Sequence, residues 1–330
     1  MIDRRQFIHL GTGAAAGLVP VLSVLPTASL AQAAWPDKPV KIIALFAAGG
    51  ASDLLSRLLA VRLQARFGQS FVVENRTGAG GNIGMQVVAN SAPDGYTIAS
   101  ATVGTLSINP YLYSRLGYDP AKDFVCVSTF WENCNVVVVS ANHPAHTLQE
   151  FRTWAASRPQ GVTYSSSGIG TTPHLAGELF GLRTGLKTVH VPFRGSAPVE
   201  VISGQIDFAI DNVASYTPFL KSGQARALAV TAATRWPVLP DVPTMAEAGV
   251  RDFVMTSWGA LAMPAATPPA VVEKLSLAVQ EISREPGMKE QFLAAGALFT
   301  TRSPQETNAM AAAERVKWKD VVRLSGAKLE

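Results

Sequence analysis

The chain has 330 residues, of which 48% are hydrophobic and 16% are charged, and its formal net charge is +4 at pH 7. This length suits about two domains with a large apolar core, so the fold needs no framework of disulfides. Gly and Pro are scattered and no dense run of Lys and Arg occurs, which excludes disordered, fibrous and polytopic membrane proteins and argues against a nucleic-acid partner.

The first 33 residues have the pattern of an export signal. Arg4 and Arg5 are followed by an apolar stretch over 11–26, and Ala31 and Ala33 have the spacing of a cleavage site. We therefore predict a signal peptide over 1–33, cleaved near Ala33, and a mature protein outside the cytoplasm. The paired arginines fit both a twin-arginine signal and an ordinary secretory signal, and the sequence does not decide between them.

From residue 40 onward, β-rich apolar runs alternate with helical patterns. Such alternation predicts parallel strands with helices packed on the sheet. Strands are expected over 40–45, 71–74, 97–101, 125–130, 136–140, 162–166, 188–191, 206–210 and 227–231. Cap residues and capping boxes predict helices that begin at Ser52, Thr147, about His174, Thr244, Thr267 and Ser303.

The number of strands favours two sheets and therefore two lobes. The segment 130–136 lies between two strong strand patterns without a helix, as expected where the chain crosses between lobes, and a second crossing is expected near 253–258. We predict a discontinuous first lobe, 35–134 plus 256–330, and a second lobe over 135–255. The fold class is α/β, with two mostly parallel sheets flanked by helices and a cleft between the lobes.

Cys126 and Cys134 are the two cysteines of the chain. In an oxidising compartment they either form a disulfide or remain two separate buried thiols. Their place in separate predicted strands favours thiols, but spacing alone does not fix the geometry.

Three loops run from the end of a predicted strand into a helix, which is where open α/β sheets bind ligands. They are 47–53, 165–172 and 192–198. Their glycines let the backbone approach a ligand, and free N–H groups at helix starts favour anions. The second loop is dense in hydroxyls, and Arg194 adds a positive charge to the third. Together they predict a site for an anion, most simply a carboxylate, without a metal or cofactor.

Three further side chains are candidates. His174 stands at the start of a helix behind the serine-rich loop, where it caps, packs or touches a ligand. Asp53 and Asp211 follow strand-end segments and either cap a helix or accept a hydrogen bond from a ligand. The predicted ligand-binding residues are Gly49, Gly50, Ala51, Ser52, Asp53, Thr102, Ser166, Ser167, Gly168, Gly170, Thr171, His174, Arg194, Gly195 and Asp211.

Catalytic and metal-binding patterns are weak. The glycines over 78–84 do not have the spacing of a dinucleotide loop, and no G-x-S-x-G elbow occurs. His143 and His146 have no evident carboxylate or thiol partner, so we expect no metal site there. We therefore predict a binding protein rather than an enzyme.

The ordered motifs of the mature chain resemble one family, the substrate-binding proteins of tripartite tricarboxylate transporters, also called the Bug family. The resemblance covers the whole mature chain. Its carriers include Trp35–Pro39, Phe46–Asp53 with Arg57, Val73–Gly84, Pro93–Thr97, Gly168–Thr171 with His174, Pro192–Pro198, Gly204–Asp207 and Leu239–Thr244.

This resemblance implies a periplasmic, two-lobed protein that closes on a small carboxylate, held by main-chain groups and bridging waters near Gly50 and Ser52. It also implies delivery to a membrane permease of one large and one small subunit, and we expect a monomer. Ala47, Ser52 and Phe193-Arg194 depart from common family residues, and the change at Phe193-Arg194 leaves the distal end of the ligand open. A periplasmic enzyme acting on a carboxylate and a receptor for a membrane sensor kinase are the alternatives, and the sequence does not identify the acid.

Overall fold

A computed structural model describes residues 35–193 and 195–326. The predicted signal peptide, its cleavage site and Arg194 lie outside these residues. The strands are β1 (Val40–Ala44), β2 (Phe71–Asn75), β3 (Thr97–Thr102), β4 (Phe124–Ser140), β5 (Val162–Ser166), β6 (Thr188–Pro192), β7 (Phe208–Asn212), β8 (Ala225–Val230) and β9 (Thr256–Pro264). The α-helices are α1 (Ala51–Phe67), α2 (Asn82–Ala89), α3 (Asn109–Leu112), α4 (Leu148–Ala156), α5 (Thr172–Thr184), α6 (Pro198–Ile202), α7 (Val213–Lys221), α8 (Pro269–Ile282), α9 (Met288–Ala294) and α10 (Pro304–Ser325). A 3-10 turn, η1 (Ala79–Gly81), and a π-helical turn, η2 (Gly104–Ile108), complete the described elements.

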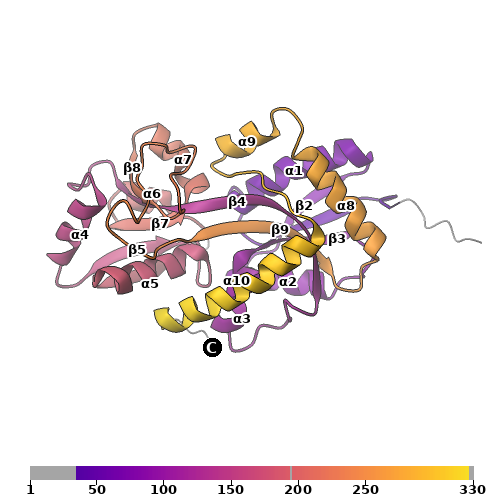
Figure 1. Ribbon diagram of the computed structural model, residues 1–330, viewed down its shortest axis with the longest axis horizontal. Coiled ribbons are helices and arrows are strands. Elements are labelled where there is room, and N and C mark those ends of the chain that lie inside the picture. Colours follow the sequence, from indigo (N-terminus) through magenta and orange to yellow (C-terminus); the bar gives the residue numbers. More distant parts are fainter. Residues whose placement is uncertain (1–34, 194, 327–330) are drawn as a thin grey trace, which may run out of the picture. The chain divides into compact units, whose positions relative to one another are not determined.

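The strands of the described residues form one mixed sheet in the order β2-β1-β3-β9-β4-β7-β5-β6, with β8 paired to β4 (Figure 1). Strands are parallel in the pairs β1–β2, β1–β3, β5–β6 and β5–β7. In the middle, β4 and β9 run antiparallel to every strand that they pair with. The predicted α/β class is confirmed, and the two predicted sheets are two parallel portions joined by antiparallel strands.

β4 corrects the prediction that 125–130 and 136–140 are separate strands, because it is one strand of 17 residues. Its partner is β9 as far as Cys134, and from Asn135 onward its partners are β7 and β8. The polar residues Asn133 and Asn135 interrupt the apolar pattern, but both are buried in the continuous ladder. The chain therefore passes between the two portions of the sheet as a strand and not as a loop.

Both cysteines lie on β4, and both are buried free thiols. An extended strand separates Cys126 from Cys134 by roughly 25 Å, far beyond the reach of a disulfide. Burial raises the pKa of the Cys126 thiol to about 12. Of the two possibilities that the sequence left open, the structure has the separate thiols.

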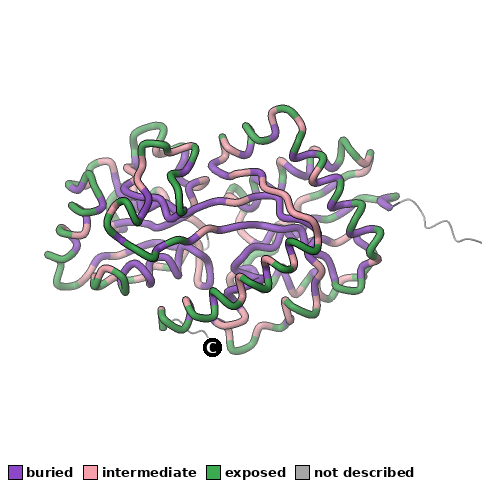
Figure 2. Tube along the Cα trace, viewed as in Figure 1, coloured by how far each residue is buried: buried purple, intermediate pink, exposed green. Residues whose placement is uncertain are grey.

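Helices cover both faces of the sheet, and most residues of the strands are buried (Figure 2). α1 and α8 pack together over β1 through Leu55, Leu59 and Leu275. In a second hydrophobic cluster, α10 packs against β4, and Trp318 of α10 is completely buried. None of the described helices is both long enough and apolar enough to cross a membrane.

Two predicted caps have different outcomes. Ser303 opens α10 as predicted, and it forms a capping box with Glu306. Thr244 exchanges hydrogen bonds with Glu247 in the same way, yet the chain makes only a turn there. The Val250 amide donates to the Met245 carbonyl, which is the bond that closes a helix C-terminus, so the turn ends at once. The helix predicted at Thr244 is therefore wrong.

Candidate ligand-binding site

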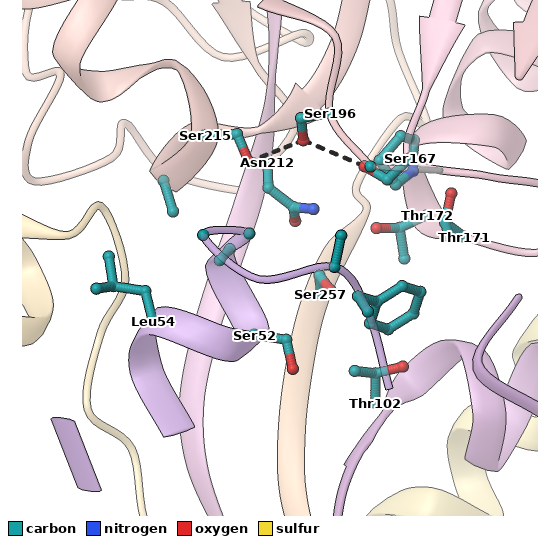
Figure 3. A pocket seen from close by; sticks show the side chains of 18 of the residues that line it. Ser52, Leu54, Thr102, Ser167, Thr171, Thr172, Ser196, Asn212, Ser215 and Ser257 are labelled. Atoms are coloured by element: carbon teal, nitrogen blue, oxygen red, sulfur yellow. Dashed lines mark hydrogen bonds between the residues drawn. The ribbon is translucent and has the colours of Figure 1, made fainter. Parts of the chain in front are cut away.

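A cavity of about 470 Å³ is bordered by strand-to-helix corners from both portions of the sheet (Figure 3). One side, here called the α1 wall, consists of the lining residues of 46–54 and 102–104. The other side, the serine wall, consists of the lining residues of 167–173, 195–198 and 212–219. Among the described residues that line the cavity there is no Asp, Glu, Lys, Arg or His. A charged ligand would therefore meet backbone groups, hydroxyls, an amide and apolar or aromatic side chains there, but no charged side chain of the described lining.

The α1 wall offers backbone amides because of the way α1 begins. Its N-cap is Gly50, which has no side chain to satisfy the free N–H groups of the first turn. The amides of Ala51 and Ser52 consequently have no partner within the helix, and both residues line the cavity. Gly49 has a φ of +81°, a conformation that residues with side chains rarely adopt. This wall is suited to bind an anion.

Asp53 fixes the α1 wall from behind and is 3% exposed. Its carboxylate accepts hydrogen bonds from the Gly49 amide at 3.0 Å and from Asn75 Nδ2 at 2.8 Å, and it pairs with Arg57 at 2.9 Å. Burial alone would raise the pKa of Asp53, but the hydrogen bonds from Arg57, Gly49 and Asn75 outweigh burial and lower the pKa. Asp53 is therefore a permanent anion that holds the loop.

Hydroxyls dominate the serine wall. Ser167 Oγ donates to Asp211 Oδ1 at 3.1 Å and lies 3.2 Å from Ser196 Oγ, which donates to Ser215 Oγ at 2.8 Å. All three serines line the cavity, and Figure 3 shows the bonds between them. Asp211 lies inside β7, which starts later than predicted, and is fully buried behind the wall. Burial raises the pKa of Asp211 to about 6, although the Asn212 amide and the hydroxyls of Ser196 and Ser167 act in the opposite direction.

Between the walls, the paired strands β4 and β9 contribute Trp131 and Ser257. Gly259 leaves room for the indole, because a Cβ at that position would lie 2.1 Å from Trp131 Nε1. Neither residue was predicted, because ligands were expected at the carboxyl ends of strands, whereas Trp131 lies in the middle of β4 and Ser257 at the beginning of β9. Asn212 and Ser215 were not predicted either, although the strand-to-helix rule that selected the other loops applies equally to the corner before α7.

The cavity brings together eight predicted residues, namely Gly49, Gly50, Ala51, Ser52, Thr102, Ser167, Thr171 and Gly195. Asp53 and Asp211 stand behind its walls rather than in them. Gly170 packs against Asn109, and Gly168 lines a neighbouring cavity. Ser166 and His174 are buried beside His190. Arg194 lies outside the described residues.

Comparison with known proteins identifies the family. Residues 55–326 match the model of the tripartite tricarboxylate transporter family receptor, TctC. Protein BugT of Bordetella pertussis is 35% identical over 299 residues, which is 90% of this chain and 92% of that protein.

The chain belongs to the TctC family.

Solved structures agree with this assignment. R. palustris Rpa4515 with adipate superposes with a TM-score of 0.87 at 36% identity, covering 89% of this chain and 100% of that one. The periplasmic binding protein BugD gives a TM-score of 0.84 at 30% identity over 90% of this chain and 100% of that one. MatC (Rpa3494) from Rhodopseudomonas palustris with bound malate gives a TM-score of 0.82 at 30% identity, covering 87% of this chain and 100% of that one. The predicted two-lobed binding-protein fold is confirmed, and the lobe boundaries stay a prediction.

His174 of this TctC receptor is buried and His190 is half-buried, and their ring centroids lie 4.4 Å apart. Burial lowers the pKa of His174 to about 3, helped by His190, and burial lowers the pKa of His190 to about 4. His190 Nε2 lies 2.7 Å from Ser166 Oγ. Both rings are neutral at pH 7, so neither supplies positive charge to an anion.

A second cavity of about 680 Å³ adjoins the first, and Phe46 and Ser167 line both. Its other walls include the glycine turn 77–81 and the residues Pro192 and Phe193. The glycine-rich segment thus shapes a cavity in this TctC receptor, although it lacks dinucleotide spacing. The described residues contain no cluster of three or more His, Cys, Asp or Glu side chains that could hold a metal.

Proposed function

We propose that this TctC receptor captures a small carboxylate between the α1 wall and the serine wall and does not alter it. The observation that carries the proposal is a cavity with no charged side chain in its described lining, where free helix-start amides stand opposite serine hydroxyls. Adipate and malate, the ligands named for two solved relatives, are both carboxylates. We assign the protein a binding role rather than an enzymatic one.

The two walls belong to different predicted lobes, 35–134 plus 256–330 and 135–255. A ligand that contacts both walls stabilises the closed arrangement, because only that arrangement makes both sets of contacts. Hydrogen bonds to a charged group are worth about 1.5–3 kcal/mol each. Four or five of them give micromolar affinity, roughly −8 kcal/mol, after association costs of several kcal/mol.

The mature protein would act in the periplasm after removal of its signal peptide and hand the acid to a membrane permease of one large and one small subunit. The family resemblance supports this partner. Uptake of the bound acid by cells should then require both this receptor and that permease. Uptake that persists after deletion of either gene would contradict the transport role, and a transcriptional response in its place would favour the signalling role.

Ligand identity is tested by mass spectrometry of acids retained after gentle purification. A thermal-shift screen then follows, with citrate, malate, adipate, glutamate, benzoate and nicotinate. We expect at least one acid to raise the Tm in a stoichiometric manner. We also expect that acid to be recovered chemically unchanged after binding. Conversion of the acid into a product would favour the enzyme, and no shift with any of these acids would reject the proposed ligand class.

A substitution at the first residue of α1 tests the site. Ala51→Pro removes the amide N–H but keeps the helix, because proline suits this position and Gly50 already has the extended conformation that precedes proline. We expect an affinity loss of about tenfold or more with an unchanged melting curve. The control Ala51→Gly keeps the N–H and should bind nearly as the natural protein does. Equal affinity of the two variants would remove the α1 wall from the site.

A further inference from the structure

A line of polar groups in the serine wall runs from a fully buried carboxyl group to the cavity. Asp211 Oδ1 and Oδ2 lie 3.1 Å and 3.3 Å from Ser167 Oγ, which lies 3.2 Å from Ser196 Oγ, and Ser196 Oγ lies 2.8 Å from Ser215 Oγ. Asp211 has no exposed surface, whereas the three serines all line the cavity. Figure 3 shows Ser196 between Ser167 and Ser215 on the side opposite Ser52 and Thr102.

Each hydroxyl has a single proton, and this limits how the line can be bonded. While Asp211 is ionised, Ser167 donates to Asp211 and Ser196 donates to Ser215, so no proton lies between Ser167 and Ser196. A proton on Asp211 Oδ2 would reverse the first bond. Asp211 would then donate to Ser167, Ser167 to Ser196 and Ser196 to Ser215, while Oδ1 still accepts from the Asn212 amide at 2.7 Å. The Ser215 hydroxyl is free to donate into the cavity in both states, and what protonation adds is the hydrogen bond from Ser167 to Ser196.

The described surroundings of Asp211 favour this protonation. Opposite it on β4 stands Val136, and Ser167 follows β5. Tyr216 of α7 is the described titratable group that interacts with Asp211, and burial raises its pKa far above neutrality, so it is uncharged. On α5, His174 is neutral at pH 7. The remaining acid of α5, Glu178, is engaged by the Tyr164 hydroxyl.

We propose that capture of an anionic ligand is coupled to the uptake of one proton by Asp211, which joins Ser167, Ser196 and Ser215 into one continuous line of hydrogen bonds that ends at the cavity. The proton comes from solvent, so no other reactant is needed. Its uptake also removes the repulsion between a buried anion and an incoming one, which is strong where water is excluded. Asp211 is thus a positioning residue, and this inference rests on the proposed function.

Isothermal titration calorimetry of the unmodified protein tests the coupling. The probe is whichever acid of the thermal-shift panel binds most tightly, titrated between pH 6 and pH 8 in buffers of different ionisation enthalpy. We expect uptake that approaches one proton per ligand, and an affinity that falls as the pH rises, by up to about tenfold per pH unit. Binding without proton uptake would overturn this inference and leave the proposed function standing. Absence of binding by every acid would overturn both.

Two substitutions locate the proton. Asp211→Asn keeps the shape and a donor toward Ser167 without a titratable group, so we expect no proton uptake and a pH-independent affinity. Ser196→Ala interrupts the line at the cavity surface, where folding is least at risk, and should reduce both affinity and uptake. Asp207→Asn, on the segment before β7 and bonded to Thr163 instead, is the control that retains uptake. If Ser196→Ala or Asp211→Asn took up as many protons per ligand as the natural protein, a group other than Asp211 would be the one that is protonated.

Discussion

Asp53 and Asp211 stand behind opposite walls of the cavity, and their surroundings differ in one respect. Asp53 has a cation beside it, Arg57, as well as amide donors, and these keep its pKa low despite burial. Asp211 has only neutral donors, so burial raises its pKa to about 6. A buried carboxylate with a counter-ion is a structural fixture, whereas one without a counter-ion has a charge state that a ligand can change.

The hydrogen-bond donors of the two walls therefore respond differently to pH. The α1 wall holds backbone amides in a loop that is fixed by an ion pair, so its donors point the same way at every pH near neutrality. The serine wall holds rotatable hydroxyls, whose direction follows the state of Asp211. Four predictions test this difference, in order of decreasing size of the change that we expect.

Removal of the Asp53 carboxylate should have the largest effect. Asp53→Ala leaves the Gly49 amide and the Arg57 guanidinium without their partner, so we expect a loss of about 3 kcal/mol in the free energy of unfolding and loss of ligand binding. Urea denaturation and calorimetry measure the two effects. Asp53→Asn keeps an acceptor for the Gly49 amide, so its stability and its affinity should lie between those of Asp53→Ala and the natural protein. If Asp53→Ala unfolded at the same urea concentration as the natural protein, Asp53 would not be the residue that fixes the α1 wall.

Acid should weaken the fold through the serine side. The pKa values of His174 and His190 lie below the ordinary value of 6.5, so the unfolded chain binds more protons there and stability falls as the pH drops from 6.5 toward 4. Asp211 opposes this loss between pH 6 and its ordinary pKa of 3.8, because its folded pKa is raised. We expect a net loss on the order of 2 kcal/mol by pH 4.5.

Urea midpoints measured across this pH range check the prediction. His190→Gln should flatten the pH profile, because one of the two histidines no longer charges on unfolding. Asp211→Asn should steepen it, since the opposing group is gone. A profile that is identical in all three proteins would mean that these groups titrate normally.

Loss of a hydroxyl from the serine wall should have a moderate effect on binding. Ser167→Ala removes a donor to Asp211 and the first link toward Ser196, so we expect an affinity loss of about tenfold, or about 1.4 kcal/mol. Calorimetry with the tightest-binding acid provides the measurement. An unchanged affinity would show that hydroxyls of this wall do not bind the ligand.

Loss of a hydroxyl from the α1 wall should have the smallest effect on the ligand affinity. Ser52 Oγ lies 3.3 Å from Ser100 Oγ, and this wall is expected to bind through amides, so Ser52→Ala should change the affinity by no more than about twofold. Titration side by side with Ser167→Ala gives the comparison directly. A loss as large as in Ser167→Ala would show that both walls act through side chains.

The sequence identified the features that depend on neighbouring residues. The glycines before Ser52 and the apolar strand that precedes them were enough to predict the loop and the helix of the α1 wall, because these segments are consecutive. The N-cap, however, is Gly50 and not the predicted Ser52. Ser303 likewise marked the start of its helix correctly.

Features that depend on pairing across the sheet could not be predicted. The continuity of β4 depends on hydrogen bonds to β9 and not on its own polar middle, and Trp131 reaches the cavity because Gly259, far along the chain, leaves space for it. The neutrality of His174 comes from burial, and its helical position carries no sign of that. The ion pair of Asp53 with Arg57 follows a helical spacing, but its role in fixing Gly49 emerges only in the folded loop.

The unbroken course of β4 beside β9 has a mechanical consequence. A ribbon of two hydrogen-bonded strands has no single pivot, so relative movement of the two portions of the sheet must twist the whole ribbon elastically. Substitutions at the irregular steps near Ser128 and Trp131, where the register shifts, would alter its stiffness. We therefore expect the rate of ligand release to depend on backbone positions such as Ser128, which does not line the cavity.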